Sequence, residues 1–423
     1  MADNFQELYE LRMKLYYNFF KMSSPESVFE LQLELAASIV DAENNIKNNN
    51  NKDNFQYHLD RIYGLADSIC WLFIDESVIK QLGLYESTIT SLSAQKGNYL
   101  DLMKRFSEDA KGKILIFSDL TRCISIGDLI EVISSDNIKL IEIKEKFSNE
   151  QHASALLRGR TGRQFSKMYW LTHYLKDEFG TLYRNKKPTK TIYVEKNYEY
   201  HYSLIPELIE KAKEEGTSII QAEEGLAFMC QNFEFENDPS ILSKCVEWGF
   251  EQPVIASTAR LTENRDATVF HKPSLLFDTN YEYRVLLHEV DYSIMGVLDV
   301  EYIKSLFKSK GYGFKYIDDM LPKIEYEGVY YTMSYRFINN ILSGMSTVDS
   351  TVEVMIDLLQ KSLKAIESMT EDEKNYSKER PKDYKTFVSH LESNYKLKQA
   401  EDGNFIILED VNGEEFMKIY SQK

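Results

Sequence analysis

The amino-acid sequence predicts a mixed α/β (α+β) protein with three regions. Residues 1–94 carry apolar side chains at helical spacing, which predicts a helical N-terminal region. Residues 95–235 alternate short β-branched runs with helical segments, which predicts a mixed-sheet domain. Residues 236–423 combine strand-like and helical pieces, and we expect a mixed C-terminal region of unassigned role.

Length and composition exclude several classes of protein. The chain has 423 residues, 43% of them hydrophobic and 28% charged, which is typical of a globular protein with a sizeable core. No apolar run reaches the roughly 18 residues that a bilayer span needs. The N-terminus has no apolar signal region, and the cysteines match no zinc or disulfide spacing. We therefore expect a cytoplasmic protein without a membrane partner.

The N-terminal region contains one clear helix start. Ser24 is a candidate N-cap because Pro25 follows it and apolar residues then recur at helical spacing. The asparagine-rich stretch 44–54 predicts a break, and residues 58–83 predict one or two further helices.

The central region predicts an ordered series of elements. Strands are expected where β-branched and apolar residues are dense over a short span. The series is a helix at 95–110, strands at 113–120, 128–134 and 138–144, a helix within 151–179, a strand at 191–195, a helix at 203–216 and a strand or hairpin at 218–233.

The C-terminal region is less regular. Residues 272–277 and 283–290 are strand-like, and residues 346–369 predict a long helix. Residues 405–420 predict a hairpin with Asn412-Gly413 at its turn.

The hairpin at 128–144 carries residues with a definite chemical use. A three-residue loop, 135–137, would place Asp128 opposite Lys144, so that Asp128, Glu142 and Lys144 share one face. A slip of one residue would turn Asp128 to the opposite face. Two carboxylates and the backbone carbonyl of Ile143 are ligands that Mg²⁺ or Mn²⁺ accepts, and the Lys144 ammonium could orient a bound water. The alternative is a polar strand face with an Asp-Lys cross-strand pair and no catalysis.

These residues resemble the PD-(D/E)XK nuclease superfamily. Gly127-Asp128 is similar to the family's aspartate position, with glycine in place of proline, and Glu142-Ile143-Lys144 is similar to its E-x-K triplet. The resemblance implies a restriction-endonuclease-like core of a helix, a three-stranded meander, a helix and a further strand. It also implies a site role for Gln164, for which a plain helix-surface position is the alternative.

Two features of the family's pattern stay open in this sequence. The tyrosine that accompanies the glutamine in RecB-like members would fall at Met168, and Tyr169 comes one residue later. Some members place an acid on the helix before the first core strand, for which Asp101 and Glu108 are the candidates.

Two basic clusters follow the hairpin in an otherwise acidic chain. The formal net charge is -17, yet residues 158–190 contain RGRTGRQFSK and YRNKKPTK. A solvated surface is one explanation, and phosphate contact is the other. The predicted substrate-binding residues are Arg158, Arg160, Arg163 and Lys167.

The sequence therefore predicts a metal-dependent nuclease that hydrolyses phosphodiester bonds, with DNA favoured over RNA as its substrate. The resemblance implies a setting in bacterial restriction, repair or defence, and cleavage of a duplex would need a homodimer or a partner subunit. The alternative is a non-catalytic nucleic-acid- or protein-binding module on a degenerate nuclease core. A third interpretation is a helical interaction protein in which the central region is only a scaffold.

Overall fold

The computed structural model describes most of the chain, and all structural statements refer to this part. The described ranges are 2–48, 51–83, 91–94, 99–144, 160–181, 188–232, 240–258, 269, 271–316, 321–371, 373, 395–399, 405–410 and 415–421.

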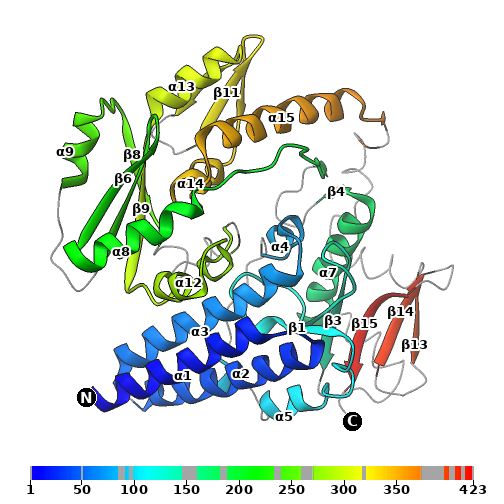
Figure 1. Cartoon of the computed structure of the whole chain (residues 1–423). Coiled ribbons are helices and arrows are strands. Elements are labelled where there is room, and N and C mark those ends of the chain that lie inside the picture. Colours follow the sequence, from blue (N-terminus) through cyan, green and yellow to red (C-terminus); the bar gives the residue numbers. More distant parts are fainter. Residues whose placement is uncertain are drawn as a thin grey trace. The chain divides into compact units, whose positions relative to one another are not determined.

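The chain divides into two compact units (Figure 1). Unit 1 contains residues 1–191 and 369–423, and unit 2 contains residues 192–368. Unit 2 is thus inserted into the sequence of unit 1. The predicted boundaries, after residues 94 and 235, differ from this division because residues 192–232 belong to unit 2.

Helices dominate the N-terminal part of unit 1, as predicted. They are α1 (Ala2–Lys21), α2 (Pro25–Lys47), α3 (Lys52–Phe73) and α4 (Glu76–Gly83), and α1, α2 and α3 lie side by side (Figure 1). Ser24 is the N-cap of α2, with its side chain accepting from the Ser27 N–H. The predicted break at 44–54 is shorter than expected, because α2 extends to Lys47 and α3 begins at Lys52.

A buried polar contact joins these helices. His58 on α3 lies 3.4 Å from an Arg12 guanidinium nitrogen through Nδ1 and 2.7 Å from the Ser38 hydroxyl through Nε2. Both His58 and Arg12 are buried. The arginine can only donate, so Nδ1 accepts and Nε2 carries the proton. The imidazole is therefore neutral in this contact.

A second buried polar contact joins α3 to the loop after the first strand. One carboxylate oxygen of Asp67 accepts the backbone N–H groups of Arg122 at 2.7 Å and Cys123 at 2.9 Å. Asp67 is fully buried, and Arg122 also forms an ion pair with Asp60 on the same helix. These contacts fix the loop that leads toward the second strand.

Six strands of unit 1 form one sheet in the order β1-β2-β3-β15-β14-β13. Their bounds are β1 Ile114–Phe117, β2 Leu129–Val132, β3 Ile138–Lys144, β13 Tyr395–Gln399, β14 Phe405–Asp410 and β15 Glu415–Ser421. Neighbouring strands are antiparallel except β3 and β15, which are parallel. The predicted C-terminal strands are confirmed, and the Asn412-Gly413 turn lies outside the described residues.

A side chain of α2 forms hydrogen bonds with the edge strand β1 of this sheet. Gln32 donates to the Leu115 carbonyl at 2.7 Å and accepts the Phe117 N–H at 2.9 Å. An unpaired strand edge is a template for association, so this amide protects β1. Unit 1 also contains η1 (Leu92–Ala94), α5 (Tyr99–Lys104), η2 (Ser118–Leu120), α7 (Arg160–Asp177), β4 (Phe179–Thr181) and β5 (Pro188–Lys190).

Unit 2 is built on an antiparallel sheet in the order β6-β7-β9-β8. The strands are β6 (Thr217–Glu223), β7 (Leu226–Asn232), β8 (Pro253–Ser257) and β9 (Tyr292–Asp299). Phe228 and Ile294 belong to a large core that includes residues of the helices α8, α12, α13, α14 and α15. Ala227 and Val297 belong to a smaller core with Cys245 of α9, so both faces of the sheet are covered.

The remaining elements of unit 2 are helices and a small sheet. The helices are η3 (Tyr202–Leu204), α8 (Ile205–Glu215), α9 (Ser240–Glu247), η4 (Ser274–Leu276), α12 (Tyr281–His288), α13 (Val300–Ser309), α14 (Arg336–Leu342) and α15 (Val348–Glu367). The small sheet contains β10 (Gly313–Tyr316), β11 (Pro322–Tyr326) and β12 (Val329–Thr332).

Two strand predictions in the C-terminal region are wrong. Residues 272–277 contain the short helix η4, and residues 283–290 lie mostly in α12. Tyr283, Leu286 and Leu287 are spaced three and four residues apart, which suits one face of a helix. A short apolar run fits either structure, and here the helical spacing prevails.

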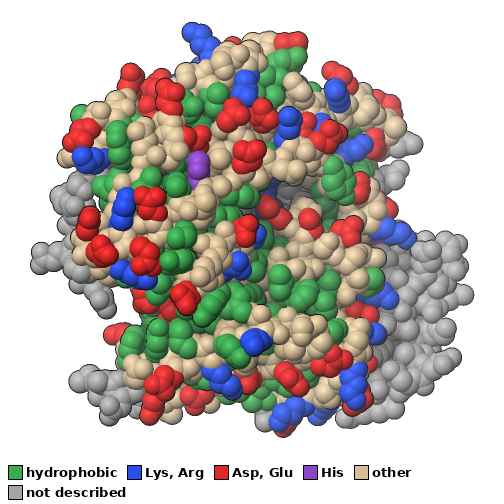
Figure 2. Space-filling view, in the orientation of Figure 1, with side chains coloured by type: hydrophobic (Ala, Val, Ile, Leu, Met, Phe, Trp, Pro, Cys, Tyr) green, Lys and Arg blue, Asp and Glu red, His purple; other side chains and the backbone are tan. Residues whose placement is uncertain are grey.

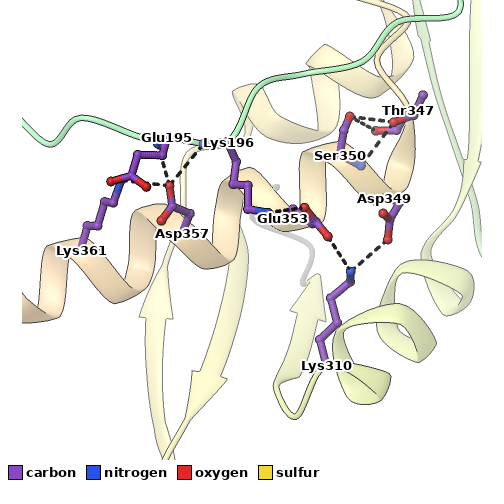
Figure 3. Close-up of polar contacts among 9 residues, drawn as sticks. All are labelled: Glu195, Lys196, Lys310, Thr347, Asp349, Ser350, Glu353, Asp357 and Lys361. Atoms are coloured by element: carbon purple, nitrogen blue, oxygen red, sulfur yellow. Dashed lines mark hydrogen bonds and ion pairs between the residues drawn. The ribbon is translucent and has the colours of Figure 1, made fainter.

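The predicted strand at 191–195 is also wrong, because this segment pairs with a helix. Residues 191–199 lie in no strand, and the Glu195 N–H donates to the Asp357 carboxylate of α15 at 2.8 Å (Figure 3). Asp349, Glu353 and Asp357 lie four residues apart along α15 and form ion pairs with lysines. These pairs are Lys310 with Asp349 and Glu353, Lys196 with Glu353, and Lys361 with Asp357 and Glu195 (Figure 3).

Close packing of α14 on β9 requires a glycine. A Cβ atom on Gly296 would lie 2.4 Å from the Leu342 carbonyl oxygen and 2.6 Å from the Leu342 Cα. We expect Gly296→Ala to lower the free energy of unfolding of unit 2 by about 3 kcal/mol, because backbone cannot yield as a side chain can. Thermal unfolding measures this change.

The matched control for that substitution is Gly249→Ala. Gly249 has φ +76°, and a Cβ atom added there would have no neighbouring atom within 4 Å. The cost of this substitution, about 1 kcal/mol, is therefore conformational only. A Gly249 variant less stable than the Gly296 variant would contradict the packing explanation.

No helix in the described ranges combines the length and apolar character needed to span a membrane.

Candidate active site

The predicted hairpin forms, with a longer loop than expected. Val132 pairs with Ile138, so residues 133–137 connect the strands, where the sequence predicted a loop at 135–137. The Asn137 carbonyl accepts the N–H groups of both Ile133 and Ser134 at 3.0 Å, which closes the loop early. The register therefore differs by two residues from the predicted one, in which Asp128 lies opposite Lys144.

The chain enters β2 through a local irregularity at Gly127-Asp128. Gly127 has φ +76°, a backbone conformation that favours glycine. Leu129 is the register partner of Ile141, and the Asp128 N–H donates to the same Ile141 carbonyl at 3.1 Å. Two residues of one strand thus face one residue of the other, as in a β-bulge, an irregularity that re-aims side chains.

The Asp128 carboxylate contacts β3 directly. Its Oδ2 accepts the Ile143 N–H at 2.7 Å. β2 begins at Leu129, so the carboxylate takes the position of a strand partner for Ile143. This bond holds Asp128 beside the segment that contains Glu142.

Glu142 is buried, whereas the polar side chains of a solvent-facing strand would be exposed. Its side chain is 3% exposed, and Leu140, two residues earlier on the same face, is 4% exposed. β3 lies between β2 and β15, so both of its edges are paired. A buried carboxylate is costly unless a cation or hydrogen bonds compensate its charge. Glu142 is therefore not a solvent-exposed residue of the hairpin.

Lys144 is placed only through its backbone. It is the last residue of β3 and pairs with Ser421 of β15. Its side chain lies outside the described residues, so its predicted position with Asp128 and Glu142 stays a prediction.

Two buried hydroxyl groups lie near Asp128 and were not predicted. Tyr99 of α5 and Ser118, which follows β1, are both buried. Neither hydroxyl has a hydrogen-bond partner in the described part of the chain. The Ser118 N–H donates to the Asp128 carbonyl at 3.1 Å. Burial raises the pKa of Tyr99 well above its usual value, and the charges of Asp119 and Asp128 raise it further.

The two upstream acids occupy the surface. Asp101 has a side chain that is 60% exposed and forms an ion pair with Lys104 at 4.0 Å. Glu108 is 79% exposed and forms an ion pair with Lys111 at 2.8 Å. Exposed pairs of this kind contribute little to stability. Sequence reasoning missed Asp119. Its charge, like that of Asp128, raises the pKa of Tyr99.

The basic segment is described only in part. Arg158 lies outside the described residues, as do the side chains of Arg160, Arg163 and Gln164, although the last three belong to α7. Lys167 is half-buried, and Met168 and Tyr169 are buried in α7. Figure 2 shows acidic and basic side chains interspersed over the described part of the face in view.

All candidate metal ligands of the site are oxygen atoms. In the described ranges, no group of three or more His, Cys, Asp or Glu side chains is arranged to hold a metal ion. The predicted set is smaller and consists of Asp128, Glu142 and the Ile143 carbonyl. Mg²⁺ accepts one or two carboxylates and keeps several waters, so this set suits it chemically. The unpartnered hydroxyls of Tyr99 and Ser118 are suitable partners for such waters.

Comparisons with models of protein families, with curated proteins and with solved structures give no match.

Proposed function

We propose that the chain is a metal-dependent nuclease that hydrolyses phosphodiester bonds of DNA, with RNA the less favoured substrate. Unit 1 would be a restriction-endonuclease-like catalytic unit. The observation that carries the proposal is that Glu142 is buried while the N–H of the next residue, Ile143, holds the carboxylate of Asp128 at 2.7 Å.

The order of elements in unit 1 supports the proposal. The resemblance implies a helix, a three-stranded meander, a helix and a further strand. Unit 1 has α5, then β1, β2 and β3, then α7. The strand next to β3 is β15, which returns from the C-terminal end of the chain after unit 2. In the proposed core it would take the place that the sequence assigned to residues 191–195.

Asp128, Glu142 and the Ile143 carbonyl would hold Mg²⁺ or Mn²⁺. When bound, the ion supplies a Lewis acid that polarises a phosphodiester oxygen and lowers the pKa of a water. The Asp128–Ile143 hydrogen bond orients the first carboxylate, and β3 fixes the second. Tyr99 and Ser118 would position water through their hydroxyl groups.

The basic residues would serve the substrate. The Lys144 ammonium would stabilise charge that develops on the phosphate, and Gln164 would join the site from α7. Arg158, Arg160, Arg163 and Lys167 would contact the phosphates of the nucleic acid. A homodimer or a partner subunit would supply the second site for cleavage of a duplex.

The test is cleavage of labelled single- and double-stranded DNA and RNA with Mg²⁺, Mn²⁺ or EDTA. We expect Glu142→Gln to lower the metal-dependent rate roughly 100-fold or more, because one ligand of the ion is lost. Glu131→Gln is the matched control, since Glu131 lies on β2 and forms an ion pair with Lys113 at 3.3 Å. Its rate should match that of the wild type.

The same variants separate catalysis from binding alone. Cleavage that persists in EDTA, or in Glu142→Gln at the wild-type rate, would contradict the proposal. Absence of cleavage, together with nucleic-acid binding that neither EDTA nor Glu142→Gln changes, would favour the non-catalytic binding module.

A further inference from the structure

The polypeptide passes between the two units twice. It enters unit 2 after Thr191 and returns to unit 1 after Ser368, the residue that follows α15. Both crossings are anchored in unit 1. The Lys190 ammonium lies 3.2 Å from a carboxylate oxygen of Glu373, and the Thr191 N–H donates to the Glu178 carbonyl at 2.7 Å. A side chain beside the first crossing is therefore in contact with a side chain that follows the second.

Within unit 2, the incoming segment lies along α15, the helix that precedes the return crossing (Figure 3). We call residues 192–199 the strap. One carboxylate oxygen of Asp357 accepts the backbone N–H of Glu195 at 2.8 Å and that of Lys196 at 3.4 Å. The backbone of the strap is thus held by a side chain of the helix.

Further contacts follow along the strap. The Glu199 N–H donates to the Ser350 hydroxyl of α15 at 3.1 Å. Val194 and Tyr198 pack against the core of unit 2 as half-buried side chains. The next residue, Tyr200, forms a β-bridge with the segment before α15, so the far end of the strap is fixed by backbone pairing.

The side-chain pairs on the strap are exposed to solvent. Lys196 lies 3.1 Å from Glu353, and Lys361 lies 3.1 Å from Glu195. The Glu195 and Lys196 side chains are 86% and 57% exposed, and exposed pairs of this kind contribute little and are screened by salt. Asp357, which accepts two backbone N–H groups, is therefore the main polar anchor of the strap.

The strap determines how many points attach unit 2. While it is bound, only residues 192–194 separate its first anchor on α15 from the last anchor in unit 1, a reach of at most roughly 10 Å. Once it is released, residues 192–199 are free and reach roughly 27 Å. A body attached at two points turns about the axis through them, whereas a body attached at one point turns about every axis.

We propose that the strap is a conformational latch. Bound to Asp357, it limits unit 2 to rotation about the two crossings, and its release lets unit 2 turn freely on the return crossing alone. Because charged groups hold the strap, a high salt concentration favours release. This device goes beyond the proposed nuclease activity and does not depend on it.

The first test is limited proteolysis of the full chain by trypsin, which cleaves after lysine. Lys196 provides a cleavage site within the strap, and the rate of this cut reports the released fraction. We expect Asp357→Ala to raise the rate roughly 10-fold or more, because hydrogen bonds to a charged acceptor are lost. Mass spectrometry of the fragments identifies the cut.

Asp349→Ala is the matched control. Asp349 also belongs to α15 and forms an ion pair, but with Lys310, which lies outside the strap. Its rate of cleavage at Lys196 should match that of the wild type. Equal rates in wild type and Asp357→Ala, or an equal rise in Asp349→Ala, would overturn the proposal. An equal rise at Lys213 of α8 would show that unit 2 unfolds as a whole, and would also overturn it.

The second test measures distances between the units by double electron–electron resonance. Spin labels are attached at Tyr17→Cys on α1 and Val246→Cys on α9, whose native side chains are 60% and 76% exposed. The four native cysteines are buried and are not labelled. We expect a broader distance distribution with Asp357→Ala than without it, and an unchanged width would overturn the proposal. Neither test uses a metal or a nucleic acid, so a failure of the proposed nuclease activity leaves both outcomes unchanged.

Discussion

Lowering the pH from 7 to 5 is expected to remove about 2 kcal/mol from the free energy of unfolding of unit 1 through His58 alone. Burial, and then the charge of Arg12, lower the pKa of His58 to about 3. The folded state therefore binds a proton less readily than the unfolded chain, whose histidine titrates near 6.5. The stabilisation is present above about pH 6.5 and is lost as the pH falls, and the loss reaches about 4 kcal/mol near pH 3.

Thermal unfolding midpoints from pH 8 to pH 4 measure this effect. His58→Gln keeps an acceptor and a donor for Arg12 and Ser38 but cannot be protonated, so its midpoint should fall less steeply than that of the wild type. The difference should reach about 4 to 8 °C at pH 5. His173→Gln is the control, because His173 is 27% exposed beside Asp177. Parallel curves for wild type and His58→Gln would show that the imidazole does not limit acid stability.

Asp67→Ala is expected to lower the free energy of unfolding of unit 1 by roughly 3 to 5 kcal/mol. The substitution leaves the buried N–H groups of Arg122 and Cys123 without their acceptor, and a bond to a charged acceptor contributes about 1.5 to 3 kcal/mol. The loop between β1 and β2 would lose its attachment to α3. Chemical denaturation, followed by circular dichroism, measures the change.

Asp67→Asn provides the comparison for this substitution. It retains the accepting oxygen, and the second carboxylate oxygen has no hydrogen-bond partner in the described structure. Burial is the main cause that raises the pKa of Asp67, so loss of its charge is tolerated, but the new amide N–H groups gain no acceptor, and we expect a loss of about 1 to 3 kcal/mol. Equal losses in the two variants would mean that the accepting oxygen is unimportant.

Local patterns in the sequence predicted the elements whose partners are close in the chain. Ser24 begins a helix as its cap, and the alternation at 138–144 gives β3 with the predicted bounds. The pattern at 191–195 failed because β-branched residues suit any extended segment, and here the partner is α15. The pairing of β3 with β15 joins distant parts of the chain, such as Ile141 and Lys418, which no local pattern records.

The candidate site was predictable to the same extent. Asp128 and Glu142 were found because two-residue periodicity places them, although the loop was two residues longer than expected. Tyr99 and Ser118 were missed, since an aromatic residue on a helix suggests core packing and a serine after a strand suggests a turn. The polar pair Ser118-Asp119, directly after β1, was the feature of the sequence that could have indicated further residues near Asp128.

The insertion of unit 2 has a consequence for biosynthesis. During translation β3 emerges well before its neighbour β15, so one edge of β3 has no native partner until residues 415–421 leave the ribosome. The strand that carries Glu142 is thus completed only in chains that include β15. Chains that terminate before β15 would expose that edge to aggregation and to proteases, and would lack the framework on which the proposed activity depends.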